Sequence, residues 1–288
     1  MEETATNTPT LYFGYGSNLD KEDWTKWCIE RGKDPTGLKE IGPAWLDEYM
    51  LCFDYFSNTR GSGAANLKRV ASGMAATPGA LFEVDDYTLK LLDIKEGVNV
   101  EGCYEQVSVT VYTAEGEACE AITYIHFAED SNFFEPSKHY ESLIRNGLLR
   151  LNLTTKWLDF ALKKDSQPSF DLVFVYGTLM RGQSRHHEME DGCHFVCNGN
   201  TQGDLYRVSD YPGIVNGKGT VKGELYRTSD AFEVMQRLDW VEGVCGDRPL
   251  FNRVIRKIET AQGELWAYSY NYNRVADEAQ LISSGEWN

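Results

Sequence analysis

The chain contains an internal repeat, and this repeat constrains its fold more than any other feature. Residues 11–19 read LYFGYGSNL and residues 172–180 read LVFVYGTLM, so each is an apolar run broken by Tyr-Gly and followed by a hydroxyl residue. Further along, residues 79–98 (GALFEVDDYTLKLLDIKEGV) parallel residues 223–244 (GELYRTSDAFEVMQRLDWVEGV). Two sequence motifs that recur in the same order predict two copies of one domain.

The spacing between the two motifs differs between the copies. Tyr15 precedes Glu96 by 81 residues, whereas Tyr176 precedes Glu242 by 66. Such a difference indicates that loops have diverged while the core has been kept. Each unit of about 150 residues is an ordinary domain size.

A helix-forming segment and a polar linker separate the two copies. From Pro136 to Lys164 apolar residues recur three and four apart, which predicts one or two helices, and Asp165 to Phe170 is polar and contains a proline. We therefore place the domains at residues 1–164 and 165–288.

Each copy is expected to be an α+β domain, built on a mostly antiparallel, barrel-like β-sheet with short helices. The helices should begin at aspartates able to cap free amides. The expected helices are Asp20 to Arg31, Asp86 to Asp93 and Asp230 to Leu238. The expected strands beyond those of the repeat are Val107 to Tyr112, Ala121 to Phe127, Phe251 to Ile258 and Leu265 to Tyr270.

The charge of the chain argues against two classes of partner. Its formal net charge is −16, which repels nucleic acid and anionic membranes over roughly 8 Å. No apolar run approaches the roughly 20 residues of a membrane helix, and the first ten residues lack the features of a secretory signal. We expect a cytoplasmic protein with no nucleic-acid or membrane partner.

The seven cysteines are odd in number and scattered, which favours reduced thiols over a disulfide framework. Cys193 and Cys197 lie close together beside His194, with His186 and His187 nearby. A zinc site there is the alternative, but no second ligand pair stands at zinc-finger spacing, so we expect no metal.

Two kinds of residue in the repeat could carry chemistry. The turn after Tyr-Gly presents successive backbone N–H groups that can hold a carboxylate or oxyanion, although a single such turn would be read as structural. The glutamate of LDxxEG recurs as Glu96 and Glu242 with the same neighbours. A partly desolvated glutamate can exchange protons near neutral pH, whereas a solvated one at a helix end would be inert. Repetition favours the functional interpretation of both.

These motifs together resemble the γ-glutamyl cyclotransferase superfamily. The first half is similar to γ-glutamyl cyclotransferase through YGSNL (15–19), GSGAANL (61–67), LDIKEGV (92–98) and PSKHYESLIRNGL (136–148). The second half is similar to the γ-glutamylamine cyclotransferase and AIG2-like branch through YGTLMRG (176–182), YPGIV (211–215), GELY (223–226) and LDWVEGV (238–244).

The resemblance implies a reaction of the lyase type, without metal or cofactor. The α-amine of a γ-glutamyl group would attack its own γ-amide, giving 5-oxoproline and a free amine or amino acid. Glu96 and Glu242 would be the general acids and bases. The binding residues it implies are Tyr15, Gly16, Ser17, Asn18, Leu19 and Asn66 in the first copy, and Tyr176, Gly177, Thr178, Leu179, Arg253 and Tyr268 in the second.

Some assignments stay open. Arg60 and Arg253 could pair with a substrate carboxylate or with a surface acid. The second copy has Thr178-Leu179 in place of Ser17-Asn18 and lacks GSGAANL, so its substrate is expected to differ. Two alternatives to a pair of enzymes remain: one catalytic domain with a regulatory or structural partner, and a non-enzymatic module that binds a small anion.

Overall fold

A computed structural model describes residues 9–71, 73–127, 132–163 and 169–288. The chain forms two compact units. Unit 1 comprises Met1–Arg69, Thr77–Val111 and Cys119–Gln167, and unit 2 comprises Val70–Ala76, Tyr112–Ala118 and Pro168–Asn288. The boundary expected near Lys164, and most of the expected linker, lie outside the described residues.

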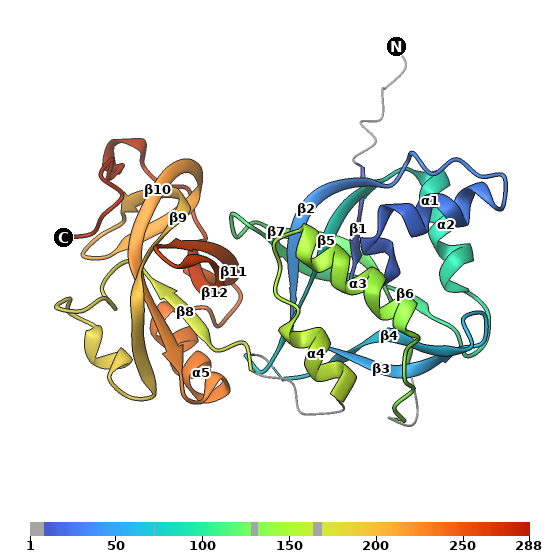
Figure 1. Cartoon of the computed structure of the whole chain (residues 1–288). Coiled ribbons are helices and arrows are strands. Elements are labelled where there is room, and N and C mark those ends of the chain that lie inside the picture. The colour runs from blue at the N-terminus through green and yellow to red at the C-terminus, as the bar shows by residue number, and fades with distance from the viewer. Residues whose placement is uncertain (1–8, 72, 128–131, 164–168) are drawn as a thin grey trace, which may run out of the picture. The chain divides into compact units, whose positions relative to one another are not determined.

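Unit 1 is built on a closed five-stranded barrel (Figure 1). β1 pairs antiparallel with β5 and parallel with β7, and this pairing closes the ring. Around the barrel the order is β1 (Thr10–Gly14), β5 (Ala76–Val84), β2 (Lys39–Asp47), β6 (Glu105–Thr113) and β7 (Ala118–Ile125).

Unit 2 is built on a second closed barrel with the same connectivity. β8 pairs antiparallel with β10 and parallel with β12, as β1 does with its own neighbours. The order is β8 (Leu172–Val175), β10 (Pro212–Thr228), β9 (Cys193–Arg207), β11 (Phe251–Thr260) and β12 (Gly263–Tyr272). The prediction of two mostly antiparallel barrel-like domains is confirmed.

Unit 1 carries elements that have no counterpart among the described elements of unit 2. A two-stranded sheet, β3 (Tyr49–Ser57) and β4 (Ser62–Arg69), is inserted between β2 and β5. Two helices, α3 (Lys138–Arg150) and α4 (Lys156–Lys163), follow the barrel. They confirm the prediction of one or two helices before Lys164.

Three helices lie where the aspartates predicted them. They are α1 (Lys21–Ile29), α2 (Asp86–Glu96) and α5 (Ala231–Glu242). Asp20 and Asp230 cap α1 and α5 by accepting amides of the first turn. The expected cap at Asp86 was wrong by one residue, because Asp85 accepts the Thr88 amide at 2.7 Å and Asp86 already lies within the helix. Short 3₁₀ turns complete the fold: η1 (Ser17–Leu19), η2 (His186–Met189) and η3 (Glu278–Gln280).

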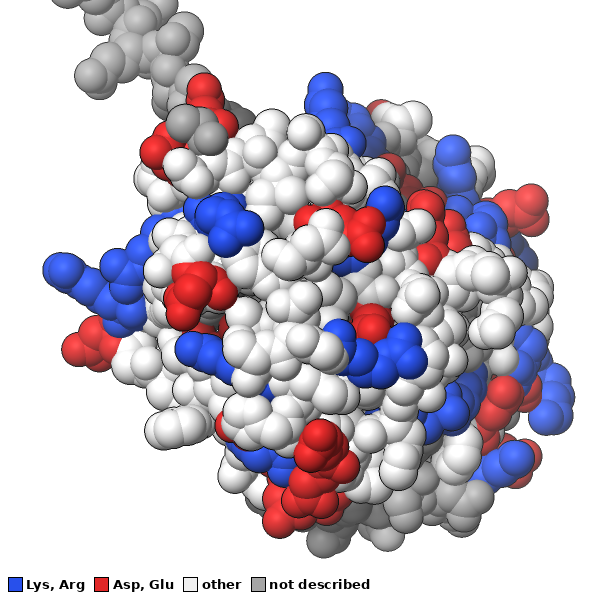
Figure 2. Space-filling model, turned by 90° about the vertical axis from the view of Figure 1, so that its left-hand side faces the viewer, with Lys and Arg blue, Asp and Glu red and all other residues white. Residues whose placement is uncertain are grey.

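The surface charge and the lengths of the helices can be compared with the prediction of no nucleic-acid or membrane partner. On the face shown in Figure 2, acidic and basic side chains are interspersed, so the negative charge is not gathered into one patch there. Within the described parts of the chain, no helix is both long and apolar enough to cross a bilayer.

The glycine that begins each GxLx motif has a packing role. A Cβ at Gly79 would overlap the carbonyl oxygen of Gly14 and the ring of Phe13. A Cβ at Gly223 would overlap the carbonyl oxygen of Val175 and the ring of Phe174 in the same way. These glycines lie within β5 and β10, and they let each strand pass close to the end of β1 or β8, just before the Tyr-Gly turn.

Gly223→Ala is expected to destabilise unit 2 by about 2 kcal/mol, because the added methyl group must push two paired strands apart. Hydrogen exchange checks this: amides of β8 and β10 should exchange faster, while those of β1 and β5 serve as the internal control. Unchanged exchange in β8 would contradict the packing role.

Candidate active site

The two Tyr-Gly turns have the same local structure. β1 ends at Gly14 and leads through Tyr15 and Gly16 into η1, where the Leu19 amide donates to the Gly16 carbonyl at 3.1 Å. In unit 2 the Met180 amide donates to the Gly177 carbonyl at 3.0 Å. The first amides of such a turn have no partner within it, so they can donate to a bound anion.

In unit 1 the tyrosine of the turn is anchored to the neighbouring barrel strand, β7. The Tyr15 hydroxyl donates to the carbonyl of Tyr124 on β7 at 2.5 Å, and the Tyr124 hydroxyl donates to Asp93 Oδ1 at 2.8 Å. Burial raises the pKa of both tyrosines, so the hydroxyls keep their protons. The turn and the helix that carries Glu96 are thereby held in one network.

The same network recurs in unit 2. The Tyr176 hydroxyl donates to the carbonyl of Tyr270 on β12 at 2.7 Å, and the Tyr270 hydroxyl donates to Asp239 Oδ1 at 2.9 Å. The other oxygen of Asp239 accepts from Arg253 Nη1 at 2.6 Å. Asp93 and Asp239 therefore orient the helix ends.

Tyr270→Phe is expected to destabilise unit 2 by about 1.5 kcal/mol, because a half-buried carboxylate loses a hydrogen bond. Urea unfolding measures the change. Tyr272→Phe on the same strand is the control, since its hydroxyl has no hydrogen-bond partner among the described residues. Equal effects of both changes would remove the case for the network.

Each glutamate is the last residue of its helix. α2 ends at Glu96 because Gly97 adopts the left-handed conformation (φ 76°), and α5 ends at Glu242 because Gly243 does the same (φ 67°). Glycine adopts this conformation without the cost that a Cβ imposes. The EG pair of the repeat thus fixes where each carboxylate leaves its helix.

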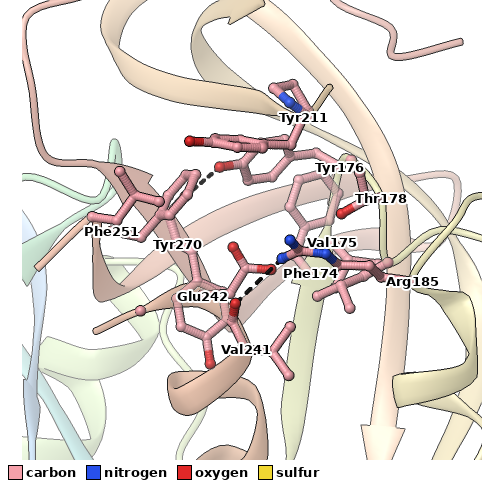
Figure 3. A pocket seen from close by; sticks show the side chains of 15 residues that line it. Phe174, Val175, Tyr176, Thr178, Arg185, Tyr211, Val241, Glu242, Phe251 and Tyr270 are labelled. Atoms are coloured by element: carbon pink, nitrogen blue, oxygen red, sulfur yellow. Dashed lines mark hydrogen bonds between the residues drawn. The ribbon is translucent and has the colours of Figure 1, made fainter. Parts of the chain in front are cut away.

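Glu242 faces a small, mostly apolar cavity of about 130 Å³ (Figure 3). The Tyr176-Gly177 turn forms one wall and Phe251 another. Burial raises the pKa of Glu242 to about 7, and the positive charge of Arg185 opposes this shift. The Arg185 backbone amide donates to the Thr178 carbonyl at 2.9 Å and its guanidinium to the Val241 carbonyl at 3.3 Å.

Glu96 faces a larger cavity of about 610 Å³ in unit 1. Its Oε1 accepts a hydrogen bond from Asn18 Nδ2 at 3.2 Å. The inserted sheet and α3 supply walls that unit 2 lacks, including Tyr55, Arg60 and Tyr140.

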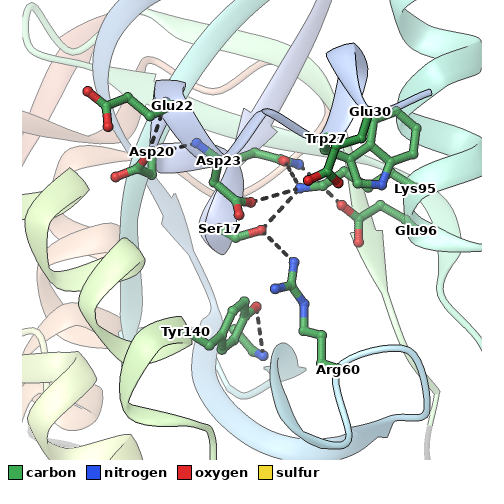
Figure 4. Close-up of polar contacts among 12 residues, drawn as sticks. Ser17, Asp20, Glu22, Asp23, Trp27, Glu30, Arg60, Lys95, Glu96 and Tyr140 are labelled. Atoms are coloured by element: carbon green, nitrogen blue, oxygen red, sulfur yellow. Dashed lines mark hydrogen bonds and ion pairs between the residues drawn. The ribbon is translucent and has the colours of Figure 1, made fainter. Parts of the chain in front are cut away.

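Two cations converge on Ser17 in this cavity (Figure 4). Arg60 Nη2 donates to Ser17 Oγ at 2.9 Å, and its guanidinium lies over the Tyr140 ring at 4.4 Å. Lys95 Nζ donates to the same oxygen at 3.1 Å. No carboxylate of the described residues forms an ion pair with Arg60, so its charge faces the cavity unpaired.

The structure brings most of the predicted site residues together. Glu96 shares its cavity with Tyr15, Gly16, Ser17 and Asn18. Glu242 shares its cavity with Tyr176, Gly177, Thr178 and Leu179.

Four predicted residues lie elsewhere. The Leu19 side chain packs against Gly147 of α3, and its amide is used within the turn. Asn66 is buried and bonds to Asp54 and to the backbone of His126. Arg253 pairs with Asp239 and lies over the ring of Tyr268, which is fully buried.

The structure adds residues that the sequence had not singled out. Tyr140 lies within the quoted PSKHYESL motif, and Lys95 within LDIKEGV. Arg185, which follows YGTLMRG, had no signal beyond its proximity to that motif.

The structure locates the two cysteines of the zinc alternative on one strand. Cys193 and Cys197 lie on β9, opposite Thr228 and Leu225 of β10. In the ranges that the structure describes, no three His, Cys, Asp or Glu side chains gather as a metal site would require.

Comparison with known proteins agrees with the repeat. The family described as "Gamma-glutamyl cyclotransferase, AIG2-like" matches residues 173–288, and the AIG2-like family matches residues 78–159. The "Gamma-glutamylcyclotransferase family protein YtfP" of Escherichia coli K12 is 35% identical over 122 residues, which are 40% of this chain and 94% of that protein.

Two solved structures are also similar to parts of this chain. The structure of a "Gamma-glutamyl cyclotransferase" is 26% identical, with a TM-score of 0.45, and the match spans 56% of this chain and 90% of that protein. YkqA from Bacillus subtilis is 16% identical, with a TM-score of 0.39, and covers 94% of this chain and 86% of its own. On the two family matches and the relatives, the chain belongs to the γ-glutamylcyclotransferase (AIG2-like) superfamily, of which it holds two tandem domains.

Proposed function

We propose that each barrel cyclises a γ-glutamyl compound to 5-oxoproline and releases an amine or amino acid. The α-amine nitrogen attacks the γ-carbonyl carbon and forms the ring C–N bond. The bond from that carbon to the leaving nitrogen breaks. One proton leaves the attacking nitrogen and one reaches the departing nitrogen, so a single group that accepts and then donates a proton completes the balance.

Glu96 and Glu242 would carry out this proton transfer. Each carboxylate lies in a cavity opposite the amides of a Tyr-Gly turn, which would hold the substrate carboxylate or the developing oxyanion. The binding residues of this proposal are Tyr15, Gly16, Ser17 and Asn18, and Tyr176, Gly177, Thr178 and Leu179.

The observation that carries the proposal is the environment of Glu242. Its pKa of about 7 lies within about one unit of that of an α-amine, near 8, so proton exchange between them costs little. A glutamate kept in an apolar cavity that is also lined by a Tyr-Gly turn has no evident structural use.

The different sizes of the two cavities support different leaving groups. The cavity beside Glu96 has room and unpaired positive charge for a large or charged leaving group, whereas the one beside Glu242 suits a small, apolar one.

The test is product analysis with a panel of γ-glutamyl amino acids and γ-glutamyl amines in heavy-oxygen water. Cyclisation gives 5-oxoproline without the heavy isotope, because water takes no part. Hydrolysis would instead give labelled glutamate and would contradict the proposal. If the folded protein forms neither product, a non-enzymatic anion-binding module becomes the better description.

A further inference from the structure

A buried cation lies next to Glu96 in the sequence and in space. The side chain of Lys95 is only 4% exposed. Burial lowers its pKa, while the nearby carboxylates of Glu96 and Asp23 oppose that shift. A buried ammonium costs several kcal/mol unless its donors are satisfied, so its partners should be informative.

The partners of Lys95 lie mainly in the Tyr-Gly turn. Lys95 Nζ donates to Ser17 Oγ at 3.1 Å and also to Asn18 Oδ1. The nearest carboxylate oxygen of Asp23 is farther away, at 3.7 Å, which is outside hydrogen-bond range. Lys95 therefore forms its hydrogen bonds with the Tyr-Gly turn, in addition to its ion pair with Asp23 of α1.

This contact determines which way the Asn18 amide faces. An ammonium can only donate, so the oxygen of Asn18 must point toward Lys95 and its NH₂ group away from it. That NH₂ group donates to Tyr12 Oη at 2.8 Å and to Glu96 Oε1 at 3.2 Å. With the amide reversed, Asn18 would turn its oxygen toward the carboxylate and repel it.

Lys95 and Asn18, which together form a hydrogen-bond chain to Glu96, are both replaced by other residues in unit 2. Leu179 stands at the position of Asn18, and Val241 at that of Lys95. Both line the cavity of Glu242, whose pKa is raised to about 7 by burial. The two residues have thus changed together between the copies.

We infer that Lys95 is a positioning residue of the first site, which acts through Asn18 to hold Glu96 in the orientation needed for proton transfer. This inference rests on the proposed function. Lys95 does not touch the reacting atoms in this scheme, so its loss should affect the rate of the chemical step more than substrate binding.

A double-mutant cycle in a Glu242→Gln background, where only the first site contributes, tests this role. Lys95→Met should lower kcat about ten- to a hundredfold with a smaller change in KM, because small misplacements of a catalytic group are costly. Asn18→Leu should do the same. The two reductions of kcat should not multiply in the double variant, because both changes break the same hydrogen-bond chain from Lys95 through Asn18 to Glu96.

Lys95→Gln is the second variant, since its amide can still donate to Asn18 without burying a charge. It should keep more of kcat than Lys95→Met, and it replaces Lys95→Met in the cycle if that variant does not fold. Lys90→Ala, an exposed lysine on the same helix, is the matched control.

The outcomes separate the two proposals. If the natural protein forms no 5-oxoproline, the proposed function fails. If it does, but Lys95→Met keeps its kcat or its loss multiplies with that of Asn18→Leu, only the positioning role is overturned.

Discussion

Glu96→Gln is expected to lower kcat at the first site by about 10²- to 10⁴-fold, the usual cost of removing a general acid or base. Glutamine keeps the size of the side chain and can still accept the hydrogen bond from Asn18, which donates to Oε1 at 3.2 Å. The Tyr-Gly turn, which is proposed to hold the substrate, is untouched, so KM should change far less than kcat. Initial rates of 5-oxoproline formation give both constants.

Glu101→Gln is the matched control for this change. Glu101 is exposed and lies shortly after α2, so the substitution removes the same charge from the same region without entering the cavity. A loss of kcat in Glu101→Gln as large as in Glu96→Gln would assign the effect to net charge. A Glu96→Gln protein with unchanged kcat would remove Glu96 from the mechanism.

Glu242→Gln is expected to make the protein more stable than its parent at pH 8, by about 3 kcal/mol. The pKa of Glu242 rises from an ordinary 4.5 to about 7 on folding. Each unit of difference between folded and unfolded states corresponds to about 1.4 kcal/mol. Keeping an ionised carboxylate in the apolar cavity therefore costs folding free energy that glutamine does not.

The pH dependence fixes the sign of this effect. Below pH 4.5 the carboxyl is protonated in both states, so parent and variant should be equally stable. Between pH 4.5 and 7 the unfolded chain releases the proton while the folded protein keeps it, and the parent progressively loses stability. Above pH 7 both states release the proton and the difference levels off.

Urea unfolding of parent and variant at several pH values measures this difference, in which the titration of all other groups cancels. Glu233→Gln, an exposed change in the first turn of α5, is the control and should show no such gain. A Glu242→Gln protein that is less stable than its parent at pH 8 would mean that the carboxylate is structurally required.

The repeat was sufficient to predict the parts of the fold and site that local sequence determines. A Tyr-Gly turn after an apolar strand and a glutamate before a helix-ending glycine are local patterns, and in the structure each glutamate shares a cavity with its turn. The helix ends were set too early, at Asp93 and Leu238. The glycine that stops each helix follows the glutamate, so each helix runs to the glutamate itself.

The remaining features depend on contacts between distant residues. Asn66 bonds to the backbone of His126, 60 residues away, and no local pattern reveals that its amide is already engaged. Tyr124 and Tyr270 anchor their turns from the last barrel strand, which requires knowledge of how the barrel closes. A lysine is ordinarily exposed, so the burial of Lys95 could not be expected from the sequence.

The most direct measurement of two cyclising sites is 5-oxoproline release from the γ-glutamyl panel by the natural protein, Glu96→Gln, Glu242→Gln and the double variant. Two independent sites predict that each single variant loses one class of substrate and that the double variant loses both. Loss of all activity in one single variant, with none in the other, would leave one catalytic domain and a non-catalytic partner. Release by a folded double variant at the natural rate would contradict the assignment of proton transfer to these two glutamates.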